Sequence, residues 1–123
     1  DYFVYLPMVA RDFSAPSPAD VQITYIEYDP PGDDVQGEHV QIENLGGAAQ
    51  EMTGWTLRDE ANRVFTFPAF TLPAGGTVRV WTGGGTNTAT DLYWGSGTAI
   101  WNNDGDTAYL RDAVGGLVST YIF

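Results

Sequence analysis

Residues 37–44 read Gly-Glu-His-Val-Gln-Ile-Glu-Asn, and this stretch decides the fold class. Its two aliphatic side chains, Val40 and Ile42, are separated and flanked by polar residues. Side chains of a β-strand point alternately to opposite faces, so this period of two predicts a strand with one buried and one solvated face. Such half-buried strands are typical of antiparallel sheets that pack against each other on one side.

The same alternation returns along most of the chain. Apolar residues occupy every second position in the runs 21–25, 55–57, 64–67, 77–81 and 107–111, and a run rich in β-branched and aromatic residues spans 117–123. After Tyr25 the apolar parity changes, because Ile26 and Tyr28 fall on the other face, which predicts a β-bulge. Glycine-, proline- and asparagine-rich turns separate the runs, and no window carries the period of a capped helix. The pattern predicts antiparallel β-sheets in a sandwich or barrel.

The chain is acidic and contains no cysteine. Its 123 residues include 16 acidic and 5 basic side chains, which give a formal net charge of −11, and all the basic ones are arginines. Nucleic-acid binding requires a basic patch that neutralises phosphates, so we expect no nucleic-acid partner. The apolar run 2–10 is far too short to span a bilayer and is interrupted by Pro7, so we expect no membrane insertion.

The composition changes near residue 20, which predicts two parts. Residues 1–20 are expected to form an N-terminal extended segment and a linker, because Ser14-Ala15-Pro16-Ser17-Pro18-Ala19 is rich in proline and serine. Residues 21–123 are expected to form the compact domain. The apolar stretch within residues 2–10 can add a strand to its own sheet or to that of a second copy, which predicts self-association through this segment.

Three motifs together resemble the lamin tail domain family over roughly residues 21–122. They are the stretch 37–44 quoted above, Gly54-Trp55-Thr56-Leu57-Arg58-Asp59, and the segment 101–112, which reads Trp-Asn-Asn-Asp-Gly-Asp-Thr-Ala-Tyr-Leu-Arg-Asp. The resemblance implies an all-β, immunoglobulin-like antiparallel β-sandwich without a catalytic centre. Within the family, the chain resembles modules of the bacterial secreted type. The resemblance therefore implies a non-catalytic interaction or spacer module of an extracellular or cell-surface protein, with a protein or cell-surface component as its partner.

Physical chemistry gives most motif residues a structural role. Trp55 is expected to be the large core anchor between the sheets, since one indole buries more area than an aliphatic side chain. Gly76 and Gly105 are expected to supply backbone angles that other residues resist. Asn44 and Asp106 are expected to cap free backbone N–H groups at strand ends.

The residues needed for common catalytic centres are missing. There is no cysteine nucleophile, no G-x-S-x-G elbow, and no lysine to complete a phosphate-binding loop. The single histidine, His39, falls on the polar face of its strand, where a solvated side chain is the simplest interpretation. A serine–histidine–aspartate triad is therefore not expected, and we predict that the protein is not an enzyme.

Two groups of residues are candidates for binding. The acidic loop that contains Asp29, Asp33, Asp34 and Glu38 can supply several of the hard oxygens that calcium prefers, although its spacing is not that of an EF-hand and solvated Asx turns explain it as well. No other cofactor is expected.

The second group is aromatic. Trp81, Tyr93 and Trp94 are candidates for a binding surface, because exposed rings on a β-sandwich can stack on sugars or on a protein partner. This group supports an alternative function, a carbohydrate-binding module that uses surface tryptophans. Packing of the same rings in the core and at sheet edges is the competing structural interpretation.

Overall fold

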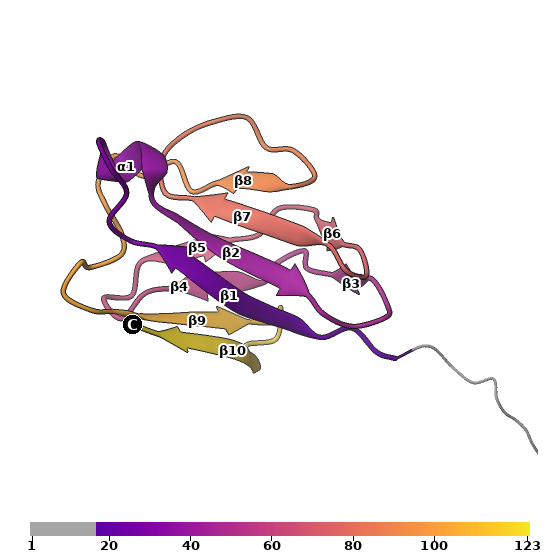
Figure 1. The fold of residues 1–123 in the computed structure, drawn as a ribbon. Helices are drawn as coiled ribbons and strands as arrows, with labels where there is room; N and C mark the ends of the chain where they lie inside the picture. Colours follow the sequence, from indigo (N-terminus) through magenta and orange to yellow (C-terminus); the bar gives the residue numbers. More distant parts are fainter. Residues whose placement is uncertain (1–16) are drawn as a thin grey trace, which may run out of the picture.

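A computed structural model describes residues 17–123 and shows two four-stranded sheets packed face to face (Figure 1). The first sheet has the strand order β1 (Val21–Glu27), β2 (His39–Asn44), β7 (Thr77–Trp81), β8 (Asp91–Tyr93). The second sheet has the order β10 (Leu117–Ile122), β9 (Thr107–Arg111), β4 (Thr56–Arg58), β5 (Val64–Thr66). A small ribbon pairs β3 (Gln50–Glu51) with β6 (Thr71–Leu72). The predicted all-β sandwich is confirmed, while the candidate strand within residues 2–10 lies outside the described residues.

The alternation in the sequence sets which side chains fill the core. Along β2, Val40 and Ile42 are fully buried, and their neighbours His39, Gln41 and Glu43 are only partly covered. The apolar residues of both sheets interdigitate in a single core, which includes Trp55 as predicted. The register of β1 against β2 shifts between Ile23 and Tyr25, so the predicted bulge is present but lies before Tyr25, whose side chain it turns outward.

Two elements differ from the antiparallel, helix-free pattern expected. β8 pairs with β7 in parallel, because the connection through residues 82–90 carries the chain back before β8 begins. A single helical turn, α1 (Asp34–Gly37), stands in the acidic loop, where the carboxylate of Asp33 accepts the Val35 N–H at 2.9 Å. One turn is too short to leave a helical period in the sequence.

One of the two predicted glycine turns is confirmed, and the other is displaced by one residue. Gly105 has a φ of +125°, a value that side chains with a Cβ rarely adopt. In the other turn the positive φ of +72° belongs to Gly75 and not to Gly76. Gly76 is needed for a different reason, since a Cβ there would lie 2.9 Å from the carbonyl oxygen of Pro73.

β1 and β10 lie side by side where the two sheets meet, and we call this junction the seam (Figure 1). One hydrogen bond crosses it, from the Ile23 N–H to the Ser119 hydroxyl at 3.1 Å. Because β1 and β10 are edge strands of different sheets, no continuous backbone ladder closes the seam. A hollow opens at each end of it.

Candidate interaction surface

A row of four rings crosses the outer face of the first sheet, with one ring from each strand. We call it the aromatic row, and its members are Tyr25 (β1), His39 (β2), Trp81 (β7) and Tyr93 (β8). The strand register places His39 opposite Trp81 and Trp81 opposite Tyr93. Successive ring centroids are 6.3, 4.4 and 6.5 Å apart, and the Trp81 and Tyr93 planes differ by only 17°. Trp81 lies on the outer face of β7, as its parity with Arg79 predicts. Tyr25 and His39 were not among the residues predicted for a binding surface.

Two carboxylates hold the polar edges of the row. The Tyr25 hydroxyl donates to Glu27 Oε1 at 2.6 Å, and this bond raises the pKa of the phenol above its ordinary value. The Trp81 indole N–H donates to Asp91 Oδ1 at 2.9 Å. This bond, with help from the Thr90 hydroxyl, lowers the pKa of the Asp91 carboxyl. Tyr25 and Trp81 are therefore oriented by hydrogen bonds to carboxylates as well as by packing.

The bond between Trp81 and Asp91 predicts a pH effect. In a Trp81→Phe variant we expect the pKa of Asp91 to rise toward its ordinary value of 3.8, because the indole donor is lost. A folded pKa below the unfolded one means that Asp91 stabilises the fold above about pH 3.8, and that this stabilisation is lost as the pH falls toward the folded pKa. An NMR titration of the side-chain carboxyl carbons measures both proteins.

Glu51 on β3 is the internal control for that titration. Hydrogen bonds from the Thr53 and Thr71 hydroxyls lower its pKa, and neither residue belongs to the aromatic row. Its pKa should be equal in the wild type and the variant. An unchanged Asp91 pKa in the variant would show that the indole does not hold this carboxylate.

The third predicted surface residue, Trp94, lies elsewhere. Its ring is partly buried against the core, with its centroid 5.8 Å from that of Phe65 and 6.1 Å from that of Trp101. Trp94 therefore does not join Trp81 and Tyr93. The Tyr93 ring packs directly on Gly85, because a Cβ added at Gly85 would lie only 2.5 Å from an atom of the ring.

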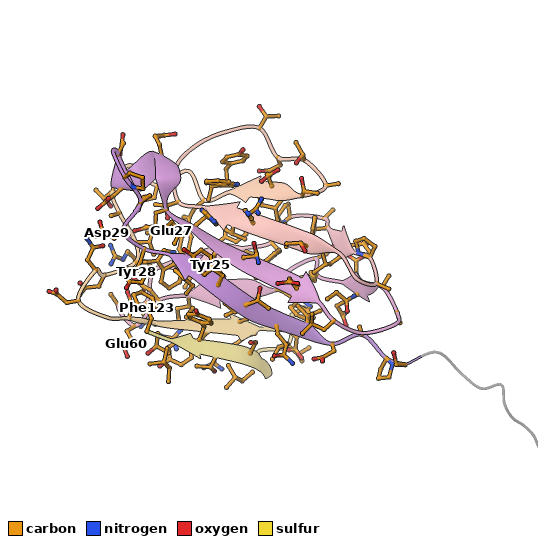
Figure 2. All side chains as sticks on the ribbon, viewed as in Figure 1. Tyr25, Glu27, Tyr28, Asp29, Glu60 and Phe123 are labelled. Atoms are coloured by element: carbon orange, nitrogen blue, oxygen red, sulfur yellow. The ribbon has the colours of Figure 1, made fainter. Side chains whose placement is uncertain are left out.

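The hollow at one end of the seam adjoins the row through Tyr25. We call it the seam hollow; it has a volume of about 530 Å³ and is lined by Tyr25, Ile26, Glu27, Tyr28, Asp29, Tyr121 and Phe123. Figure 2 shows the labelled members of this set gathered at the ends of β1 and β10. The Tyr28 and Phe123 rings are stacked, with centroids 4.3 Å apart and planes 11° apart. The stack forms an aromatic wall between the edges of the two sheets.

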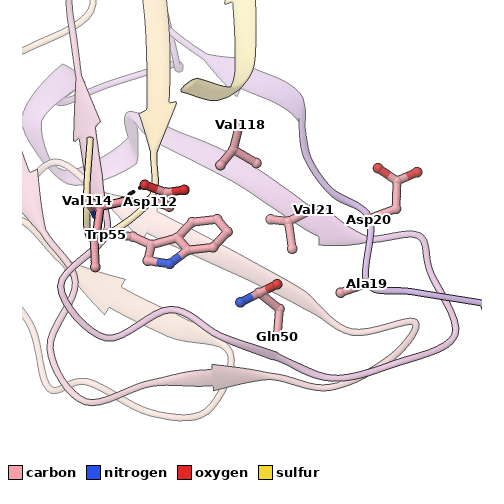
Figure 3. A pocket seen from close by; sticks show the side chains of 9 residues that line it. Ala19, Asp20, Val21, Gln50, Trp55, Asp112, Val114 and Val118 are labelled. Carbon is pink, nitrogen blue, oxygen red and sulfur yellow. Dashed lines mark hydrogen bonds between the residues drawn. The ribbon is translucent and has the colours of Figure 1, made fainter. Parts of the chain in front are cut away.

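A second hollow, of about 480 Å³, lies at the other end of the seam (Figure 3). The Trp55 indole lines it together with Val21 and Val118, and Asp20 and Gln50 stand at its rim. Trp55 is nevertheless only 7% exposed, so most of its ring is packed in the core. This hollow therefore exposes one edge of a core residue.

Three buried carboxylates hold the long connection of residues 94–106, which links β8 to β9. Glu38 Oε1 accepts the backbone N–H groups of Ile100 and Trp101 and the Thr82 hydroxyl, at 2.7, 3.1 and 2.7 Å. Asp59 pairs with the Arg63 guanidinium at 2.9 Å, and that guanidinium donates to the carbonyl oxygens of Ala99 and Ile100.

Asp106 is the third of these carboxylates. It accepts the backbone N–H groups of Asn102, Glu60 and Thr107. Asn44 likewise accepts the N–H groups of Asp20 and Gly46, so the predicted capping by Asn44 and Asp106 is confirmed. Each of the three quoted motifs thus contributes one carboxylate that fixes the same connection.

The family model described as Lamin Tail Domain matches residues 14–123. The chain belongs to the lamin tail domain family. No curated protein matches it. The lamin tail domain family has an immunoglobulin-like, non-catalytic fold, and membership in it indicates an interaction module.

This lamin tail domain does not assemble the predicted calcium set. Glu38 is fully buried and its Oε1 is taken by three donors, which corrects its assignment to a surface metal shell. Asp33 caps α1. Within residues 17–123, no group of three or more histidine, aspartate or glutamate side chains is placed to hold a metal ion. Calcium binding by Asp29, Asp33 and Asp34 stays a prediction.

The histidine of this lamin tail domain lies within the aromatic row. His39 Nδ1 is 3.0 Å from the carbonyl oxygen of Gly37, and its ring packs between Tyr25 and Trp81. Among the described residues, no helix is long and apolar enough to cross a membrane. In the row, Tyr25 is exposed and the other three rings are partly exposed, which suits the row to contact with another molecule.

Proposed function

We propose that this lamin tail domain is a non-catalytic interaction module of a secreted or cell-surface bacterial protein, and that it contacts a protein or cell-surface component through the aromatic row. The single observation that carries the proposal is the alignment of four partly exposed rings across four strands. Aromatic side chains are enriched at interfaces, because they bury a large area at little cost in conformational entropy. Rings already fixed by carboxylates lose even less freedom when a partner binds.

Binding to envelope material of the producing organism tests the proposal. The labelled domain is sedimented with washed envelopes, and its bound fraction is measured against concentration. We expect Trp81→Ala to weaken this binding by about tenfold or more, because it removes the largest ring of the row. The binding surface proposed here would be wrong if the Trp81→Ala domain, still folded by circular dichroism, bound as well as the wild type.

Tyr109→Ala is the matched control for that experiment. Tyr109 is a partly exposed ring on the outer face of the second sheet, so its loss removes a similar area far from the row. We expect this variant to bind like the wild type. Equal losses in the two variants would indicate a general effect of truncating surface aromatics.

A neutral carbohydrate is the second candidate partner. The observation that favours it is the small angle of 17° between the Trp81 and Tyr93 planes, since nearly parallel rings can support a flat sugar face. Binding on a glycan array that is lost in Trp81→Ala supports this candidate. Envelope binding that depends on Trp81, combined with no glycan binding, favours a protein partner.

A further inference from the structure

The seam hollow combines aromatic faces with negative charge and contains no basic residue. Of the seven residues that line it, four are aromatic and two are acidic. Glu27 accepts the Tyr25 hydroxyl, and Asp29 is exposed at the rim. Aromatic rings carry negative charge on their faces, so this lining is attractive to a cation from several directions.

We propose that the seam hollow binds a guanidinium or ammonium side chain from a basic segment of a partner protein. The hollow measures about 530 Å³, a volume within the usual range of binding pockets and ample for one arginine side chain. A cation placed within about 6 Å of a tyrosine ring gains attraction from its face. The carboxylates of Glu27 and Asp29 add direct charge pairing at the rim.

The outer face of the second sheet carries cation–π contacts whose cations come from this chain itself. On the second sheet, the Arg58 guanidinium carbon lies 4.4 Å from the Tyr109 ring centroid, and that of Arg111 lies 5.8 Å away. These are the cation–π contacts found within residues 17–123, and none involves a ring of the seam hollow. The Tyr109 ring on the outer face of the second sheet is therefore supplied with cations by this chain, whereas the rings and carboxylates of the seam hollow can receive a cation from another molecule.

Charge across the first sheet also favours a basic partner. Its strands contain one arginine, Arg79, which stands in register with Asp91 on the β7–β8 side of the sheet. The hollow lies along β1, at the other edge of the same sheet. The net charge of −11 attracts a cationic segment over a longer range and raises its association rate at low salt.

This inference rests on the proposed interaction function, because Tyr25 belongs to both the aromatic row and the seam hollow. It is tested separately by calorimetric titration of the whole chain with a capped tri-arginine peptide, a capped tri-citrulline peptide and choline. Citrulline has nearly the shape of arginine but no charge, and choline represents a free small ammonium ion. We expect the arginine peptide to bind at least about tenfold more tightly than either of the others.

Two matched pairs of variants locate the site. Glu27→Gln and Asp104→Asn each remove one negative charge, but only Glu27 lines the hollow, and the amide that replaces its carboxylate can still accept the Tyr25 hydroxyl. We expect the first to weaken peptide binding about fivefold and the second by less than about twofold. Tyr25→Leu should weaken binding, while Tyr25→Phe, which keeps the ring face, should not.

The outcomes separate this inference from the proposed function. Equal binding of the citrulline and arginine peptides, or equal effects of Glu27→Gln and Asp104→Asn, would overturn the cation site. Choline binding as tight as that of the arginine peptide would replace the partner side chain with a free ammonium ligand. If no peptide binds but Trp81→Ala still abolishes envelope binding, the interaction function stands and the cation site fails.

Discussion

Replacing Glu38 with alanine is expected to lower the free energy of unfolding by about 3–5 kcal/mol. The Glu38 carboxylate is fully buried, and its Oε1 accepts hydrogen bonds from Thr82, Ile100 and Trp101. Alanine leaves these three donors in the interior without an acceptor, and each unsatisfied donor costs about 1–3 kcal/mol. Part of that cost is offset because alanine also removes Glu38 Oε2, a buried oxygen without a hydrogen-bond partner, so the three penalties do not add in full.

Urea unfolding at neutral pH measures this loss, with Glu38→Gln as the informative comparison. Glutamine keeps an oxygen that can accept the same donors, so we expect it to cost only about 1 kcal/mol. Asp104→Ala, an exposed carboxylate in the turn before Asp106, should change the free energy by less than about 0.5 kcal/mol. Equal effects of alanine and glutamine at position 38 would show that the three hydrogen bonds do not set the stability.

The burial of Glu38 could not be predicted from the sequence, and the reason is physical. In the sequence it is one more acidic residue in an acidic loop, next to a strand whose alternation is easily recognised. Its donors come from residues 44, 62 and 63 positions further along the chain. The end of β7 brings Thr82 to it, and the packing of the connection 94–106 over the start of β2 brings Ile100 and Trp101; no local pattern encodes either arrangement.

The strands themselves were predictable, because each alternating run decides its own inner and outer face. The run 39–43 places Val40 and Ile42 inside without any information from other strands. The same parity puts Trp81 outward on β7. Trp94 follows the last residue of β8, so strand parity no longer fixes the direction of its side chain, and its ring turns toward Phe65 and Trp101.

Assembling the candidate site required the pairing between strands. His39 occupies the polar face of its strand, which is unremarkable in a single strand. Tyr25 alternates with the buried Val21 and Ile23 in the sequence, and only the bulge between Ile23 and Tyr25 turns it outward. Their alignment with Trp81 and Tyr93 depends on the registers of β1 with β2, β2 with β7 and β7 with β8. The last of these pairings is parallel, which alternation alone does not reveal. The seam hollow likewise needs β1 and β10, which lie at opposite ends of the described chain.

Replacing Trp55 with alanine is expected to cost about 3–5 kcal/mol of unfolding free energy, the typical loss for a large buried ring. Trp55 is 7% exposed and lies between the sheets beside the second hollow. Trp55→Phe keeps an aromatic ring in the core and should lose about half as much. Val114 lines the same hollow but is 92% exposed, so Val114→Ala should change the free energy by less than about 0.5 kcal/mol.

Combining the milder substitutions at these two positions tests whether the two ends of the sandwich contribute to stability independently. Trp55 lies beside Val21 at the first residue of β1, whereas Glu38 precedes His39, which pairs with Glu27 at the last residue of β1. Sites without shared partners have additive effects to within about 0.5 kcal/mol. We therefore expect the losses of Trp55→Phe and Glu38→Gln to add in the double variant, measured by urea unfolding with a constant denaturant slope. A clear departure from additivity would mean that the two ends of the sandwich are coupled through the core, because the two residues share no contact through which they could interact directly.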